Sequence, residues 1–159
     1  MKNIGFYITI ILASFLVACT SETVCRKDMT VLGLVTLEAD SMRADDRMVR
    51  YTSWDSVTIR AIDNEMYILY NNKSISKIPL PLRPDTNLTA FLLTYHGQTD
   101  TLFVEHTPRE YFVNLACGCA VYHTITNAWS TDSRVDSVQI INASVENALQ
   151  ENLRIHLHE

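Results

Sequence analysis

Alternation of apolar and polar residues is the sequence feature that most restricts how this chain can fold. Val57, Ile59 and Ala61 alternate with Thr58 and Arg60, and this period of two is typical of a strand with one buried face. Similar short runs, separated by turn residues, recur along the chain. The pattern predicts an all-β domain, an antiparallel β-sandwich of the immunoglobulin-like or Greek-key type with about eight or nine strands. The predicted strands are 29–37, 57–61, 66–70, 88–95, 101–106, 110–116, 119–129, 135–142 and 153–157, with one helical turn within 145–152.

Prolines limit where some of these strands can lie. Residues 78–84 contain three prolines, which cannot donate hydrogen bonds to a neighbouring strand. This segment is therefore expected to cross between sheets or to run along a sheet edge. Pro108 is expected to separate the strands 101–106 and 110–116. His106, Arg109 and Glu110 around it are interpreted as a loop with an ion pair.

The first 19 residues indicate export and lipidation. Residues 4–16 are almost wholly apolar and follow Lys2; they suit a signal peptide and are too few to span a bilayer, which needs about 20 residues. Leu16-Val17-Ala18-Cys19 matches a lipobox. We therefore expect residues 1–18 to be a cleaved lipoprotein signal peptide and Cys19 to carry acyl chains that hold the protein on a membrane. Residues 19–27 would form the lipidated tether and 28–159 the sandwich domain.

Charge and the residues after Cys19 bear on location. Cleavage would remove Lys2 and leave 12 basic and 18 acidic residues. A domain with this net negative charge is not expected to bind nucleic acid or anionic lipid headgroups, so membrane attachment would depend on the acyl chains of Cys19. Thr20, in place of an aspartate, favours the outer membrane. Because Glu22 is the one acidic residue close to Cys19, the periplasmic face is favoured over the cell surface.

Three further cysteines could form disulfides in an exported protein. The favoured bridge joins Cys25 to Cys117, and closing a loop of about 93 residues could contribute roughly 4–5 kcal/mol on the chain-entropy model. Cys119 is the alternative partner of Cys25. Because Gly118 allows local distortion, a small ring between Cys117 and Cys119 is a further alternative.

Four short motifs place an aspartate before a serine or threonine and an apolar residue. They resemble the O-glycosylation motif of exported Bacteroidota proteins, which would place sugars on Ser41, Ser56, Thr101 and Ser137. The alternative is local, because Asp-Ser and Asp-Thr pairs also make good turns into strands.

Short segments along the mature chain together resemble a family of uncharacterised Bacteroidota lipoproteins, catalogued as a domain of unknown function. That resemblance implies an exported all-β lipoprotein and no reaction. The matching segments are the lipobox ending at Cys19, Cys25, Asp55-Ser56-Val57, Leu80-Pro81-Leu82, Asp100-Thr101-Leu102, Tyr111-Phe112-Val113 with Cys117-Gly118, Asp136 to Asn142, and Asn152-Leu153-Arg154-Ile155.

Two classes of function are consistent with these features. The first is a non-catalytic binding or structural module of the cell envelope that engages an envelope protein or glycan, with Tyr51, Trp54 and Trp129 as possible contacts. The second is a small metal-handling or enzymatic protein that uses Cys117, Cys119 and His123, since thiolates and imidazole bind soft metals. The first is preferred, with no catalytic residues, no metal site and no cofactor predicted.

Overall fold

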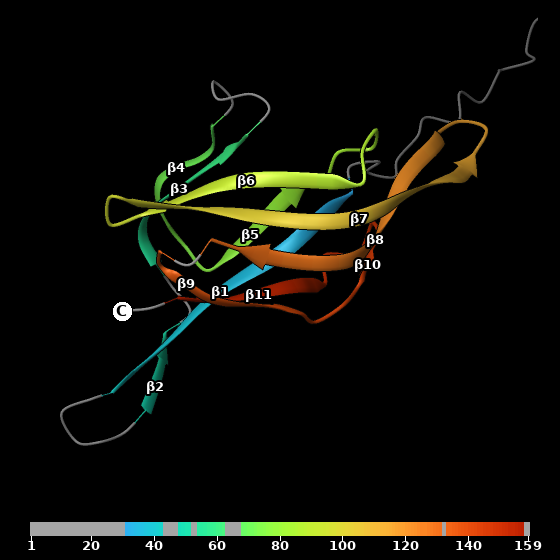
Figure 1. The fold of residues 1–159 in the computed structure, drawn as a ribbon. Helices are drawn as coiled ribbons and strands as arrows, with labels where there is room; N and C mark the ends of the chain where they lie inside the picture. The colour runs from blue at the N-terminus through green and yellow to red at the C-terminus, as the bar shows by residue number, and fades with distance from the viewer. Residues whose placement is uncertain (1–30, 43–47, 52–53, 63–67, 132, 158–159) are drawn as a thin grey trace, which may run out of the picture.

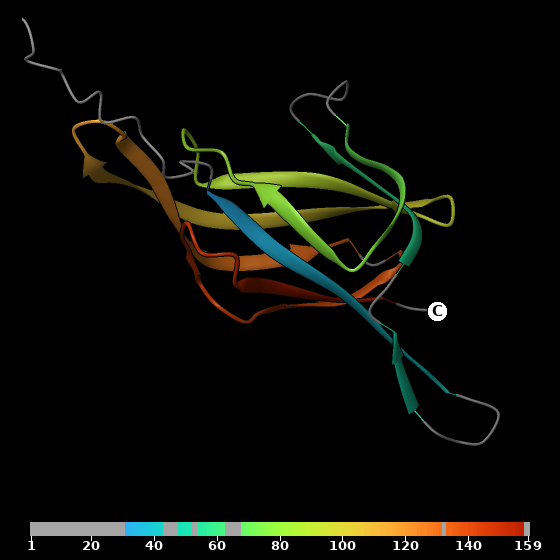
Figure 2. The same ribbon diagram turned by 180° about the vertical axis from the view of Figure 1, so that it is seen from behind.

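The computed structural model describes residues 31–42, 48–51, 54–62, 68–131 and 133–157, and these form two facing β-sheets (Figures 1 and 2). The predicted signal peptide, Cys19 and Cys25 lie outside the described residues. The all-β prediction is confirmed. The strands are β1 (Leu32–Met42), β2 (Met48–Tyr51), β3 (Trp54–Ala61), β4 (Ile68–Ile75), β5 (Lys77–Pro81), β6 (Leu88–Tyr95), β7 (Gln98–Asn114), β8 (Gly118–Ser130), β9 (Val135–Ile140), β10 (Ser144–Val145) and β11 (Glu151–Leu157).

The two sheets have different strand orders. The five-stranded sheet runs β2-β1-β11-β9, with β5 also paired to β1, and the six-stranded sheet runs β10-β8-β7-β6-β3-β4. The prediction of wholly antiparallel pairing is wrong at one place, because β1 and β11 are parallel. These are the first and last described strands, so the parallel pair closes the domain by joining its two ends.

The core lies between the sheets and follows the period of two. Along β6, Thr89, Phe91 and Leu93 are buried, while their neighbours are half-buried or exposed. The opposing sheet contributes the alternating buried residues Leu153, Ile155 and Leu157 of β11. Burying apolar side chains from both sheets in one layer is the main favourable term in the folding of such a domain.

The proline-rich segment behaves as the sequence predicts. Strand β5 follows β4 after a single residue, yet β4 belongs to the six-stranded sheet and β5 to the five-stranded one. Within the described residues β5 pairs with β1 alone, with Pro79 opposite Leu34 and Pro81 opposite Leu32. The segment thus crosses between sheets and then runs along an edge, where a missing donor costs least.

Pro108 does not end a strand, and this prediction is wrong. β7 continues through it for 17 residues, from Gln98 to Asn114. β6 pairs with β7 only as far as the Leu88–Glu105 pair, so at Pro108 the ladder pairing is with β8 alone, opposite His123. A proline is tolerated there because one side of the strand needs no donor. His106, Arg109 and Glu110 therefore belong to a strand and not to a loop.

The predicted helical turn within 145–152 is also wrong. Val145 is fully buried in β10 and pairs with His123 of β8, and β11 begins at Glu151. No helix in the described part of the chain is both long and apolar enough to cross a bilayer.

Candidate functional site

A polar hollow lies where β7, β8 and β10 meet. It has a volume of about 370 Å³ and is open to solvent. A cavity of this size is within the usual range for small-molecule sites. Its lining side chains are Arg109, Tyr111, Tyr122, His123, Thr124, Ser144 and Glu146.

Strand register brings these residues together. Arg109 of β7 faces Tyr122 of β8, and Thr124 of β8 faces Ser144 of β10. Tyr111 and Tyr122 stack across the hairpin with ring centroids 5.1 Å apart and planes within 11° of parallel. The hollow therefore has an aromatic wall made by two strands.

The charges of the hollow balance. Arg109 contributes one positive charge and Glu146 one negative charge, and both line the cavity. The Ser144 hydroxyl donates a hydrogen bond to Glu146 Oε1 at 2.8 Å, which orients the carboxylate. A neutral, polar ligand with hydroxyl groups suits this lining better than an ion does.

Behind the hollow lies a pair of buried histidines. His106 of β7 is 1% exposed and His123 of β8 is 3% exposed. Their Nδ1 atoms are 3.1 Å apart, and the two rings meet edge to face. Two imidazoles at this distance share one proton in a hydrogen bond, so their tautomers are coupled.

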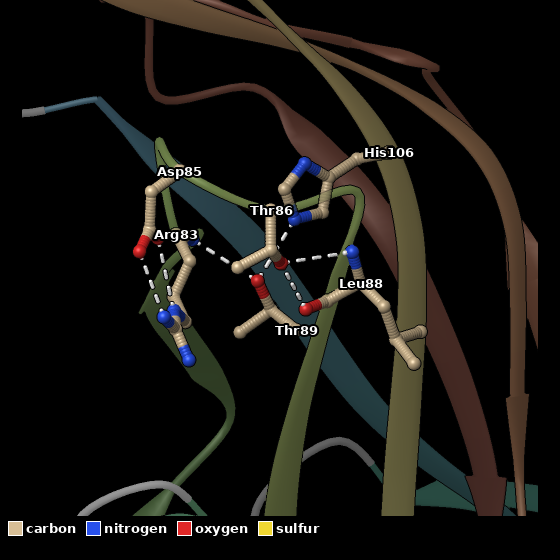
Figure 3. A network of polar contacts seen from close by, with 6 residues as sticks. All are labelled: Arg83, Asp85, Thr86, Leu88, Thr89 and His106. Atoms are coloured by element: carbon tan, nitrogen blue, oxygen red, sulfur yellow. Dashed lines mark hydrogen bonds and ion pairs between the residues drawn. The ribbon is translucent and has the colours of Figure 1, made fainter.

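A chain of hydrogen bonds couples these tautomers to the Thr89 hydroxyl. The backbone N–H of Arg83 donates to Thr89 Oγ1 at 3.0 Å, and Thr89 Oγ1 is 2.8 Å from His106 Nε2 (Figure 3). With one lone pair of Thr89 used in this way, its hydroxyl proton is available to His106 Nε2. When Thr89 donates to His106 Nε2, His106 carries its proton on Nδ1 and donates to His123 Nδ1. When His106 Nε2 donates to Thr89, the proton between the two rings lies on His123 Nδ1 instead.

Both histidines are neutral at physiological pH. Burial lowers the pKa of His106, and burial together with repulsion from His106 lowers the pKa of His123 to about 4. Desolvation disfavours the charged imidazolium because the surroundings solvate it less well than water does. His123 therefore brings no positive charge to the lining of the hollow.

The predicted O-glycosylation residues lie on four different strands. Ser56 of β3 is exposed and has a positive φ of 64°, whereas Thr101 of β7 and Ser137 of β9 are half-buried. Ser41 is in β1, and its side chain lies outside the description.

Asp100, which precedes Thr101, has a structural role. Its carboxylate is 1% exposed and accepts hydrogen bonds from the Thr131 hydroxyl and from the backbone N–H groups of Ser133, Arg134 and Val135. Burial raises its pKa, but these bonds outweigh burial, and the pKa of Asp100 is lowered. These bonds reach residues 31 to 35 positions further along the chain, so at this motif the aspartate holds a distant segment and does not form the local turn of the alternative interpretation.

The cysteines bear on the metal-handling alternative. Cys117 is disulfide-bonded and Cys119 is an exposed free thiol. Cys25, the predicted partner of Cys117, lies outside the described residues, so that pairing stays a prediction. A bonded Cys117 offers no thiolate, and His123 Nδ1 is directed at His106, so the structure does not assemble Cys117, Cys119 and His123 into a metal site. No cluster of three or more potential ligands occurs in the described ranges.

The aromatic contacts predicted from sequence are scattered. Trp129 is 40% exposed and stacks on Phe103 at 5.3 Å, away from the hollow. The side chains of Tyr51 and Trp54 lie outside the description. Sequence reasoning missed Tyr111, Tyr122, Ser144 and Glu146 as site residues, because they become neighbours only through strand register.

Comparison with known proteins identifies one family. The family of unknown function DUF6452 matches residues 56–157, which is more than half of the chain. No curated protein and no solved structure matches the chain significantly. The match begins in β3 and ends at the last residue of β11, so it includes the whole hollow and the histidine pair.

Proposed function

The chain belongs to the DUF6452 family, whose function is unknown, and we propose that it is a lipid-anchored, exported, non-catalytic binding module of the bacterial cell envelope. Its site is the hollow between β7, β8 and β10. The observation that carries this proposal is the balanced lining of the hollow, with one cation, one anion, hydroxyl groups and a stacked tyrosine pair.

The proposed ligand is a sugar unit of an envelope glycan. Flat tyrosine rings can pack against the apolar face of a sugar ring, while Arg109 and Glu146 can donate to and accept from neighbouring hydroxyl groups. An envelope protein is the competing partner. The lowered pKa of His123 supports binding over acid–base chemistry, because an efficient general base has a pKa near the working pH.

The anchoring part of the proposal rests on the sequence. A signal peptide at 1–18, acylation of Cys19 and an outer-membrane location with the periplasmic face favoured would follow from the lipobox and from the residues after it. This export would also suit a disulfide-bonded Cys117. The finer assignments, to Bacteroidota lipoproteins and to the immunoglobulin-like type of sandwich, belong to this proposal.

The glycan site can be tested by saturation-transfer NMR of the purified protein with free mono- and disaccharides from envelope glycans. We expect transfer to at least one sugar, and Arg109→Ala and Glu146→Gln should weaken its binding about tenfold, as expected for loss of a hydrogen bond to a charged group. Arg83→Ala is the matched control, because Arg83 pairs with Asp85 outside the hollow and should bind like the wild type. Absence of transfer to every sugar would refute the glycan site.

The anchor is tested by the intact mass of the protein from its native membrane. We expect a chain that begins at Cys19 and carries the added mass of acyl chains, and Cys19→Ala should abolish both the added mass and membrane retention. A full-length, unacylated chain would refute the anchor.

A further inference from the structure

The β7–β8 hairpin extends past the rest of the six-stranded sheet. Pairing of β6 with β7 ends at Glu105, and β10 pairs with β8 only at His123 and Thr124. Among the residues that the structure describes, the hairpin from Arg109 to Tyr122 is thus a two-stranded ribbon, and both views show it projecting at one end of the molecule (Figures 1 and 2).

The turn at the end of this ribbon displays an apolar residue. Asn114 Oδ1 accepts hydrogen bonds from the backbone N–H groups of Ala116 and Cys117, at 2.9 and 2.8 Å. Gly118 has a φ of 74°, a conformation that glycine adopts readily. The tight turn leaves Leu115 at its apex with 96% of its surface exposed, and Phe112, three residues earlier, is 58% exposed.

The tip has no charge. The twelve residues from Tyr111 to Tyr122 include no Asp, Glu, Lys or Arg, and the nearest charged residues are Arg109 and Glu110. Exposed strand edges in soluble proteins are usually protected by charged side chains, and a contiguous exposed apolar patch marks an interaction surface. The uncharged, exposed tip of this ribbon therefore indicates a contact with an apolar partner.

The tyrosine pair marks a boundary between two environments. Tyr111 and Tyr122 stack across the ribbon, with apolar residues on the tip side and charged residues on the body side. Tyrosine is enriched at membrane–water interfaces, where its ring lies at the level of the lipid headgroups. From the tip toward the domain, the ribbon thus presents apolar residues, then the tyrosine pair and then charged residues. This is the order expected from the lipid to the water across such an interface.

The chain also reaches this end of the molecule from its N-terminal side. Both views place the start of β1 toward the same end as the hairpin tip (Figures 1 and 2). The described residues begin at Val31, 12 residues after Cys19, a span of at most about 40 Å when extended. The predicted partner of Cys117, Cys25, is six residues from Cys19, which would hold the tip close to the lipid.

We infer that the tip of the β7–β8 hairpin, Phe112 to Cys117, inserts into the surface of the lipid bilayer and orients the anchored domain. Insertion is shallow because unpaired backbone groups on the ribbon edges cannot enter the hydrocarbon core without cost. The four residue-to-residue steps from Tyr111 to Leu115 span about 13 Å in extended backbone, which suits burial at the headgroup–acyl boundary. The inference takes its membrane from the proposed anchor and adds a second contact.

The test uses the protein isolated from its native membrane and reconstituted into phosphatidylcholine vesicles with or without brominated acyl chains. In Leu115→Trp, tryptophan fluorescence should shift to shorter wavelength and be quenched by bromine beyond the wild-type background of Trp54 and Trp129. Leu149→Trp is the matched control, because Leu149 is 73% exposed and lies outside the hairpin, and it should match that background.

The possible results separate a failure of the proposed tip insertion from a failure of the proposed anchor. Equal quenching of the Leu115→Trp and Leu149→Trp variants would overturn the inference, including the case in which a protein partner covers the tip instead. The intact mass reports the anchor separately. Acylated protein with an unquenched tip would refute only the inference, and unacylated protein whose tip is quenched on added vesicles would refute only the anchor.

Discussion

A few buried polar side chains help to specify how the strands of this domain are arranged. His106 and His123 occupy positions between the sheets that would suit apolar residues, and they are tolerated because each has a partner. Asp100 brings a carboxylate into the interior and satisfies it with four donors from the chain after β8. Buried polar groups that are satisfied in this way specify one arrangement of the strands.

The histidine pair predicts acid sensitivity. In the folded protein both pKa values are lowered from 6.5, that of His123 to about 4. Between these values the unfolded chain binds more protons, so the free energy of unfolding should fall as the pH falls from about 6.5 toward 4. Urea unfolding at several pH values would measure this slope.

A double variant provides the comparison for that slope. His106→Gln with His123→Gln should flatten the pH dependence in this window, because the groups whose pKa is lowered are gone. His96→Gln is the control, since His96 is exposed in the β6–β7 turn. Identical slopes in the wild type and the double variant would contradict the assignment.

Asp100→Asn tests the role of the buried Asp100 carboxylate and its four hydrogen bonds. The amide nitrogen that replaces one carboxylate oxygen cannot accept a hydrogen bond, so two of the four donors that Asp100 now binds would lose their acceptor. We expect a loss of about 2–3 kcal/mol in the free energy of unfolding, measured by urea denaturation at pH 7. Asp85→Asn should change stability little because Asp85 is exposed, and an equal effect of the two variants would count against this role.

At the scale of strands, register and edges decide where residues meet. β7 and β8 form the longest pairing in the fold, and their register places Pro108 opposite His123 and Arg109 opposite Tyr122. β5 uses its prolines at an edge, and β10 contributes Ser144 to the lining of the hollow. The proposed site is thus a product of strand pairing and not of a contiguous motif.

Asn152 joins strands of the two sheets. Its Oδ1 accepts from the backbone N–H of Leu34 in β1, and its Nδ2 donates to the carbonyls of Asn142 and Ser144. Because it is 2% exposed, Asn152→Ala would leave these groups without partners. We expect unfolding to be easier by about 2–4 kcal/mol.

Thermal and urea unfolding would measure that loss. Asn127→Ala is the control, because Asn127 is exposed on β8 and should have a small effect. A loss no larger than that of the control would show that Asn152 is not a joint between the sheets.

At the scale of the whole molecule, the hollow and the hairpin tip are neighbouring features with different partners. The tyrosine pair belongs to both, since it lines the hollow and borders the uncharged tip. If the tip lies on the membrane, the hollow opens close to the bilayer surface. A ligand would then be bound at a set height above the lipid.

Alkylation of the folded protein tests the cysteine arrangement. Without reduction, iodoacetamide should modify Cys119, because it is the exposed free thiol, and peptide mass spectrometry should find Cys117 unmodified. After reduction, Cys117 and its predicted partner Cys25 should both react. Labelling of Cys117 before reduction, or a Cys25–Cys119 peptide, would contradict the favoured pairing.

The sequence by itself determined the class of the fold and the places of most strands. Alternation at 57–61 required a strand with one buried face, because side chains alternate across a sheet. The three prolines of 78–84 required that segment to cross between sheets or to run along an edge. These are local properties of the backbone, so they can be predicted without knowing the neighbours. The lipobox at Cys19 is likewise local, and its prediction awaits the mass measurement.

Only the tertiary structure decided which strands are partners. The parallel pairing of β1 with β11, the passage of β7 through Pro108 and the loss of the predicted helical turn all depend on contacts between distant residues. The hollow and the histidine pair depend on the same register. Because a shift of one residue moves every side chain to the opposite face of a sheet, these neighbours could not be read from spacing along the chain.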